Sequence, residues 1–313
     1  MKLFRGFACA GALLAFVLAV LGSWVRINDA GLTCPDWPLC HGALVPSLHG
    51  GVVLEWSHRF VALVESFVVL GAIVTGVRER KRIAGVTPAL IALGIVFACQ
   101  VCLGGATVLL ANSPLSVMLH WGMGMAFLGT LTVLAVLALL APDPASASLP
   151  TLQFDSGAAP PLALAAGLAF VTMCAGAYVS SSFAGLACPT FPGCNGTPFG
   201  ATAAQFIQML HRLSAGAFAI VAVVAMLAAL RASSRRVAAF AALGLALVCV
   251  QIGLGIANVV WQLPLGLREA HAANAGATFL AFVIAATLAA LEPQRSAARG
   301  RERARAARPV TST

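Results

Sequence analysis

The stretch VLEWSHRFVALVESFVVLGAIVTGV, residues 53–77, is mainly apolar over a length that crosses a bilayer. A helix needs roughly 20 such residues to span the hydrocarbon core. Similar stretches lie near residues 6–26, 86–110, 117–141, 160–181, 204–230, 236–260 and 269–291. These runs are too long and too evenly apolar for barrel strands, and a bilayer satisfies no stray backbone amide. The sequence therefore predicts an all-α integral membrane protein with eight transmembrane helices.

The composition agrees with a membrane protein, because 60% of the residues are hydrophobic, 9% are charged and the mean hydropathy is +0.94. With eight spans, most basic residues fall on one side: Lys2, Arg5, Arg78, Arg80, Lys81, Arg82, Arg231, Arg235, Arg236 and the arginines from Arg295 to Arg308. The other side has Arg26, Arg59, Arg212 and Arg268. This positive-inside asymmetry predicts cytoplasmic termini in a cell membrane. The net charge of +9 thus indicates topology, with anionic lipid as a further partner of the basic tail and no nucleic acid.

An internal duplication relates residues 22–120 to residues 176–271. The segments that match, in chain order, are GLTCPDWPLCHG (31–42) with GLACPTFPGCNG (185–196), EWSHR (55–59) with QMLHR (208–212), and QVCLGGATV (100–108) with QIGLGIANV (251–259). His120 then matches His271, and the offset between the copies drifts only from 154 to 151 residues.

The duplication divides the chain into two four-helix halves. Residues 1–141 form the first half, residues 160–291 the second, and residues 292–313 a basic cytoplasmic tail. The segment 142–159, which is rich in Pro, Ser and Asp, reads as a cytoplasmic linker. Because both halves start on the same side, they are expected to be parallel repeats that form two pseudo-symmetric four-helix bundles.

Four histidines occupy equivalent places in the repeat, each in the first turns of an even-numbered span: His58, His120, His211 and His271. All four enter from the outer side, so their imidazoles are expected at similar depths, two in each half. Ionisable groups inside a membrane are costly and indicate function. Neutral imidazole is a common axial ligand of haem iron, and paired ligands suit iron better than zinc or copper, which need three or four converging ligands. A proton relay or another metal stays open.

Charged residues near these histidines differ between the halves. Arg59 and Arg212 follow their histidines directly, which predicts either pairing with haem propionates or snorkelling to the lipid headgroups. Glu55 shares a helix face with His58, whereas Gln208 stands at its place in the second half. This difference predicts a reactive first half with Glu55 as a proton donor or acceptor. Glu65, two turns further along, is a weaker candidate for a proton path.

Two cysteine pairs with equal spacing lie in outer loops on an oxidising face, Cys34 with Cys40 and Cys188 with Cys194. They predict two local disulfides. Thiol exchange with a redox partner is an equal alternative for the first pair, while structure is favoured for the second. Cys99 and Cys102 form a CxxC inside a span and are interpreted as packing residues.

The ordered combination of eight spans, EWSHR (55–59), GGATV (104–108), the paired loop cysteines and the four histidines resembles haem A synthase of the bacterial and mitochondrial type. The resemblance covers the chain up to about residue 291 and implies a bacterial inner-membrane enzyme that oxidises a ring methyl of haem O to the formyl group of haem A for cytochrome oxidase. It implies that His58 and His120 hold the haem substrate beside an essential Glu55. It also implies that His211 and His271 hold a haem b cofactor.

The resemblance implies redox events or haem transfer at Cys34 and Cys40, and haem O synthase as the source of the substrate. Cytochrome oxidase assembly factors and a second copy of the chain are further expected partners. The electron donor is not indicated by the sequence. The rival interpretation is a bis-histidine haem b cytochrome that transfers electrons without converting either haem. A transporter is a third interpretation, but no pair of interrupted helices indicates a substrate site at mid-membrane.

Overall fold

The computed structural model describes residues 1–83, 85–141, 152, 154, 157–232 and 234–306, and it describes side chains as far as Leu291. The linker predicted for residues 142–159 lies mostly outside the described residues, as do the last seven residues of the predicted tail.

Eight helices are present in the described chain, and each has the length and composition to cross a membrane. They are α1 (Lys2–Ile27), α2 (Gly50–Glu79), α3 (Val86–Leu109), α4 (Pro114–Leu140), α5 (Ala159–Ser181), α6 (Ala203–Arg231), α7 (Arg235–Val260) and α8 (Leu265–Ala306). Each predicted span falls within one helix except at the ends of α3 and α4, where the span runs one residue further. The all-α membrane fold is therefore confirmed. The main difference is α8, whose backbone continues as helix to Ala306 into the segment predicted as a tail.

Local signals in the sequence explain several helix starts. Pro160 and Pro161 stand in the first turn of α5, where a missing backbone N–H costs nothing. Ser113 caps α4 by accepting a hydrogen bond from the Ser116 N–H. Thr202 and Gln205 form a reciprocal capping box at the start of α6. The caps of α4 and α6 fix the starts of two of the four helices that carry the repeated histidines.

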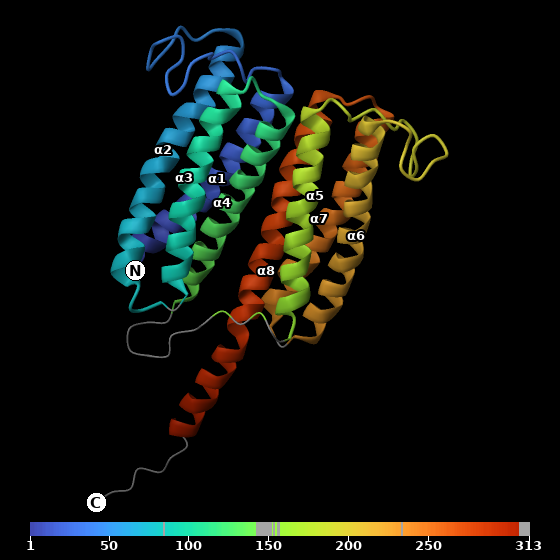
Figure 1. Ribbon diagram of the computed structural model, residues 1–313. Helices are drawn as coiled ribbons and strands as arrows, with labels where there is room; N and C mark the ends of the chain where they lie inside the picture. Colours follow the sequence, from blue (N-terminus) through green and yellow to red (C-terminus); the bar gives the residue numbers. More distant parts are fainter. Residues whose placement is uncertain (84, 142–151, 153, 155–156, 233, 307–313) are drawn as a thin grey trace, which may run out of the picture.

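The helices form two groups of four that lie side by side (Figure 1). In the first group, neighbours in contact are α1 with α2, α2 with α3, α3 with α4, and α4 with α1. The second group repeats this ring with α5 to α8. The groups meet through contacts of α4 with α5, of α4 with α8 and of α1 with α8. Accordingly α4 and α8 are the most buried spans, while the other helices present apolar side chains outward, as lipid requires.

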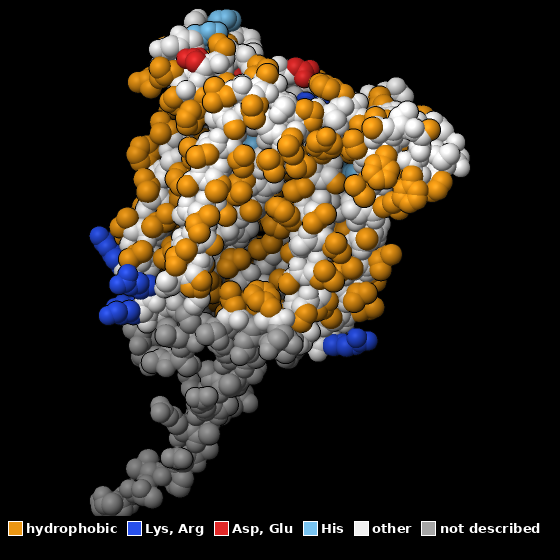
Figure 2. All heavy atoms as spheres, viewed as in Figure 1, with side chains coloured by type: hydrophobic (Ala, Val, Ile, Leu, Met, Phe, Trp, Pro, Cys, Tyr) orange, Lys and Arg blue, Asp and Glu red, His pale blue; other side chains and the backbone are white. Residues whose placement is uncertain are grey.

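The two ends of the bundle differ in composition. One end has the long loops 28–49 and 182–202 and is called the loop end. The opposite end, called the basic end, has the exposed side chains of Arg78, Arg80, Lys81, Arg82, Arg231, Arg235 and Arg236. In Figure 2, Lys and Arg side chains gather at the basic end, which is the lower end in this view. Apolar side chains cover the visible face between the basic end and the loop end. The structure thus places the basic residues of both halves at one level.

Candidate functional site

The four repeated histidines lie on α2, α4, α6 and α8, near the loop end of each helix. Within each half the two helices concerned, α2 with α4 and α6 with α8, stand diagonally opposite in the ring of contacts. His58 and His120 thus come from opposite helices of the first half, and His211 and His271 from opposite helices of the second. Each half therefore brings two imidazoles toward its interior from opposite helices.

A glycine on the preceding helix lies against each imidazole. A Cβ added to Gly22 would lie 3.0 Å from Cε1 of His58, and one added to Gly176 would lie 2.9 Å from Cε1 of His211. The same relationship holds for Gly104 with His120 and for Gly255 with His271, at 3.3 Å each. Any larger residue at the first two positions would push the ring away. These four glycines, here called the seat glycines, hold the imidazoles directly against helix backbone.

Sequence reasoning missed the seat glycines, although a signal for them exists. Gly22 and Gly176 are related by the same offset as the matched loops, and Gly104 and Gly255 lie in the matched segments 100–108 and 251–259. Small residues are common in membrane helices, so their recurrence alone does not indicate a contact with histidine. Only the rotation of each helix about its axis reveals that contact.

Ring nitrogens indicate what these sites can bind. Nδ1 of His211 lies 3.1 Å from the backbone oxygen of Thr172, so an Nδ1–H donated there leaves Nε2 with a free lone pair. Nδ1 of His58 and Nδ1 of His271 are buried and have no hydrogen-bond partner in the described part of the chain. Two imidazoles that come from opposite helices of an apolar bundle are suitable ligands for a haem iron. No group of three or more His, Cys, Asp or Glu side chains that could hold a metal ion occurs among the residues described.

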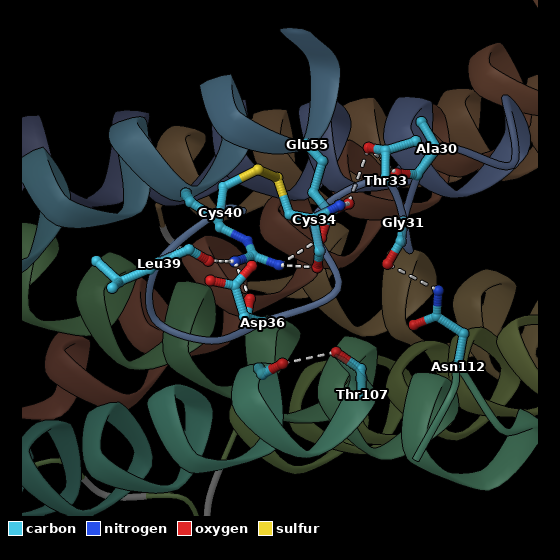
Figure 3. A network of polar contacts seen from close by, with 12 residues as sticks. Ala30, Gly31, Thr33, Cys34, Asp36, Leu39, Cys40, Glu55, Thr107 and Asn112 are labelled. Carbon is cyan, nitrogen blue, oxygen red and sulfur yellow. Dashed lines mark hydrogen bonds and ion pairs between the residues drawn. A yellow bond between two sulfur atoms is a disulfide. The ribbon is translucent and has the colours of Figure 1, made fainter. Parts of the chain in front are cut away.

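Glu55 faces the loop 28–49. Its Oε2 accepts hydrogen bonds from the Cys34 N–H (2.7 Å) and the Thr33 hydroxyl (3.0 Å), and its Oε1 pairs with Arg59 Nη2 (2.5 Å). The side chain is 5% exposed, so this carboxylate is buried, and both of its oxygens have partners. Figure 3 shows it beside the disulfide that joins Cys34 and Cys40. The residue thus ties the start of α2 to the loop above it.

Arg59 completes the attachment of this loop. Its guanidinium donates to the backbone oxygens of Cys34 (2.9 Å), Asp36 (2.7 Å) and Leu39 (2.5 Å), in addition to the carboxylate of Glu55. Both Glu55 and Arg59 flank His58 on α2, so the loop is fixed directly to the helix turn that carries the histidine. In these contacts the guanidinium binds backbone oxygens of the loop. They are additional to the two roles expected from the sequence, which are pairing with haem propionates and snorkelling to the headgroups.

The second half repeats the attachment with an amide in place of the carboxylate. Oε1 of Gln208 accepts from the Cys188 N–H (2.6 Å), and its Nε2 donates to the Gly185 oxygen (2.7 Å). Arg212 donates to the backbone oxygens of Cys188, Thr190, Pro192 and Gly193. Cys188 and Cys194 are joined by a disulfide like that of the first loop. A glutamine can therefore hold the loop. Loop attachment does not by itself require an acidic side chain at this position.

The two loops differ in how they meet the helices. The indole of Trp37 lies on α3, where a Cβ on Gly105 would be 3.2 Å from Trp37 Cδ2. Asn112, in the turn before α4, donates to the Gly31 oxygen (3.0 Å) and ties the loop to that turn. At the matching places of the second half, Ile256 replaces Gly105 and Phe191 replaces Trp37. Phe191 is 55% exposed and stacks under the guanidinium of Arg212 instead.

Asp36 organises the tip of the first loop. Its carboxylate accepts from the Gly42 N–H (2.8 Å) and the His41 N–H (2.6 Å). These two donors, Gly42 first, hold the pKa of Asp36 below its ordinary value of 3.8. The His41 ring contacts the Thr33 oxygen through Nε2 (2.9 Å), so His41 belongs to the loop rather than to either histidine pair.

Comparison with known proteins relates most of the chain to one group. Residues 5–51 and 48–283 match the model of a family described as cytochrome oxidase assembly protein (COX15-CtaA). Among curated relatives, the heme A synthase of Shewanella oneidensis is 30% identical over 320 residues, covering 85% of this chain and 91% of its own length. The heme A synthase of Bacillus licheniformis is 29% identical (87% and 91% covered), and that of Bacillus pumilus is 27% identical (82% and 85% covered).

Proposed function

Because the chain belongs to the cytochrome oxidase assembly protein family, we propose that it is a haem A synthase, a membrane enzyme that oxidises a ring methyl of haem O to a formyl group. The observation that carries this function is the presence of two diagonal histidine pairs, each on its glycine seats, in a chain that matches curated heme A synthases over both halves.

The two halves have different tasks in this proposal. His58 and His120 hold haem O, which is the substrate, and His211 and His271 hold a resident haem b. Support comes from differences at matching positions of the two halves. Glu55 is matched by Gln208 and the buried Glu65 by Phe218, and the indole of Trp37 lies on α3. The haem b, when bound, supplies a redox centre for electron transfer.

Converting a methyl to a formyl group replaces two hydrogen atoms by one oxygen atom, which is a four-electron oxidation. Successive hydroxylation gives a gem-diol that loses water to the aldehyde, and the oxidant and electron donor are external to this chain. The protein fixes the substrate and handles protons. Glu55 is the proposed proton donor or acceptor, since it is the carboxylate nearest to His58 along α2 and is positioned by Arg59 and Cys34.

Arg59 and Arg212 act in this proposal by fixing the loops over their respective haem sites. The two disulfides close these loops, and their location at the loop end agrees with an oxidising outer face. The basic end then faces the cytoplasm of a bacterial inner membrane, with both termini inside. Haem O synthase supplies the substrate, and cytochrome oxidase receives the product.

Pigment analysis tests the proposal. The protein is purified from cells that make haem O, and its haems are extracted and separated by chromatography. A haem A synthase contains haem O or haem A together with haem b, whereas an electron-transfer cytochrome contains haem b alone. His58→Ala is expected to lose the convertible haem and keep haem b, and His211→Ala is expected to lose haem b. The reverse pattern would mean that the halves have exchanged roles, and haem b alone in the unaltered protein would exclude the synthase.

A further inference from the structure

Glu65 is a buried carboxyl group inside the first bundle. Its side chain is 2% exposed, and neither carboxylate oxygen has a hydrogen-bond partner among the described residues. It follows His58 on α2 by seven residues, which is two helical turns and about 10 Å toward the basic end. Residues at this spacing share one face of a helix, so Glu65 and His58 face the same interior.

The surroundings of Glu65 are apolar and include a small residue. A Cβ on Gly11 of α1 would lie 3.6 Å from Glu65 Oε1 and 3.1 Å from Leu131 Cδ2 of α4. No salt bridge is formed by Glu65 within the described chain. A carboxyl group in such a place is costly unless a hydrogen-bond partner satisfies it.

At the equivalent position the second half has no carboxyl group. Phe218 occupies the place of Glu65, Ala165 that of Gly11 and Phe282 that of Leu131. The rings of Phe218 and Phe282 pack edge to face, with centroids 5.6 Å apart. The same position of the fold is therefore filled by hydrocarbon in the half proposed to keep haem b, and by a carboxyl group in the half proposed to convert its haem.

We propose that Glu65 recognises the oxygen that the reaction places on the inner edge of the haem, as a carboxylic acid that donates a hydrogen bond to the product formyl group. The inference rests on the proposed function, because it needs His58 to hold the converted haem. A macrocycle held at its iron by His58 would have one edge within reach of residues further along the same face of α2, where Glu65 lies. An un-ionised acid has the O–H donor that a formyl oxygen accepts.

This role makes Glu65 a specificity-determining residue. Haem O has a methyl group where haem A has the formyl group, so only the product, or an oxygenated precursor of it, satisfies the acid. A buried hydrogen bond of this kind changes relative affinity about tenfold. The site would thus favour oxygenated haem over haem O and hold a partly oxidised substrate until the aldehyde is complete.

The test compares Glu65→Gln, Glu65→Leu and the matched control Phe218→Leu at the equivalent position of the second half. Each purified protein, with its haem b in place, is titrated with haem O and with haem A, and the formyl C=O stretch of bound haem A is measured by resonance Raman spectroscopy. In the unaltered protein the stretch is expected below that of haem A in an apolar solvent. Glu65→Leu is expected to raise it to the solvent value and to lower the preference for haem A over haem O about tenfold.

Glu65→Gln, whose amide N–H still donates, is expected to keep part of the shift, and Phe218→Leu all of it. Haem b content serves as the measure of folding in every variant. An unchanged stretch and preference in Glu65→Leu would overturn the role of Glu65 while leaving the synthase intact. If the unaltered protein bound neither haem O nor haem A, the proposed function itself would fail, and the inference with it.

Discussion

Cε1 of His58 lies 3.0 Å from the point that a Cβ on Gly22 would occupy, so the imidazole of α2 rests on the bare backbone of α1. The equivalent pair in the second half, His211 and Gly176, has the same relationship at 2.9 Å. Helices α1 and α5 thereby set the position of histidines that they do not carry.

Alanine at a seat glycine is predicted to displace the ring and weaken haem binding. Gly22→Ala should reduce the haem of the first half, and Gly176→Ala the haem b of the second, each by roughly tenfold, because overpacking typically costs about 1–3 kcal/mol. Extracted haem content measures both. Gly94→Ala is the matched control, since nothing lies within 4 Å of a Cβ there. Equal haem content in all three proteins would show that the glycine contact is irrelevant.

Glutamine at position 55 is predicted to separate proton transfer from loop attachment. Gln208 already holds the second loop through the Cys188 N–H, so Glu55→Gln should keep the Cys34 contact and the haem while conversion of haem O falls at least about tenfold. Glu55→Ala removes the acceptor of the Cys34 N–H and the carboxylate paired with Arg59, which keeps its backbone acceptors, and should also reduce loop order at a cost of about 1–3 kcal/mol. Haem A yield and protease resistance of the loop are the two measurements. Normal haem A yield from Glu55→Gln would remove Glu55 from the chemistry.

Isoleucine at position 105 is predicted to lift Trp37 off α3. The second half has Ile256 there, and its loop aromatic residue is exposed. Trp37 is 43% exposed, so Gly105→Ile should increase the exposure of its indole further. In a variant that keeps Trp37 as its one tryptophan, a red shift of the emission and faster quenching would report this change. The haem b of the second half should be unaffected. Emission identical to that of the unaltered protein would mean that the indole does not depend on this glycine.

The tip of the first loop is predicted to be sensitive to strong acid only. The Gly42 and His41 amides lower the pKa of Asp36 in the folded protein. The contribution of Asp36 to the stability of the loop is therefore present above its ordinary pKa of 3.8, and it is lost as the pH falls through the lower pKa of the folded state. The protection of these two amides against hydrogen exchange should stay constant from about pH 8 to about pH 5. It should decrease below about pH 4. The second loop is an internal control, since Thr190 takes the place of Asp36 and accepts from the Asn195 N–H without titrating. A loss of protection near neutral pH would contradict this role of Asp36.

Much of the fold could be predicted because its signals are local along the chain. Eight apolar runs, the duplication and the spacing of Cys34 with Cys40 each follow from residues close in sequence, and a bilayer permits little besides helices for such runs. The sequence also predicts that His58 and His211 lie at the same depth, because they occupy equivalent turns in two parallel repeats. The family resemblance adds the expected chemistry to positions that these patterns had already singled out.

Contacts between helices were decided by the tertiary structure alone. The sequence places Glu55 next to His58, but only the folded loop shows that Cys34, Thr33 and Arg59 occupy its carboxylate. The same holds for the seat glycines and for the burial of Glu65 beside Gly11. The physical reason is that hydropathy fixes where a helix begins and how long it is, whereas its rotation is fixed by packing against neighbours that are distant in sequence.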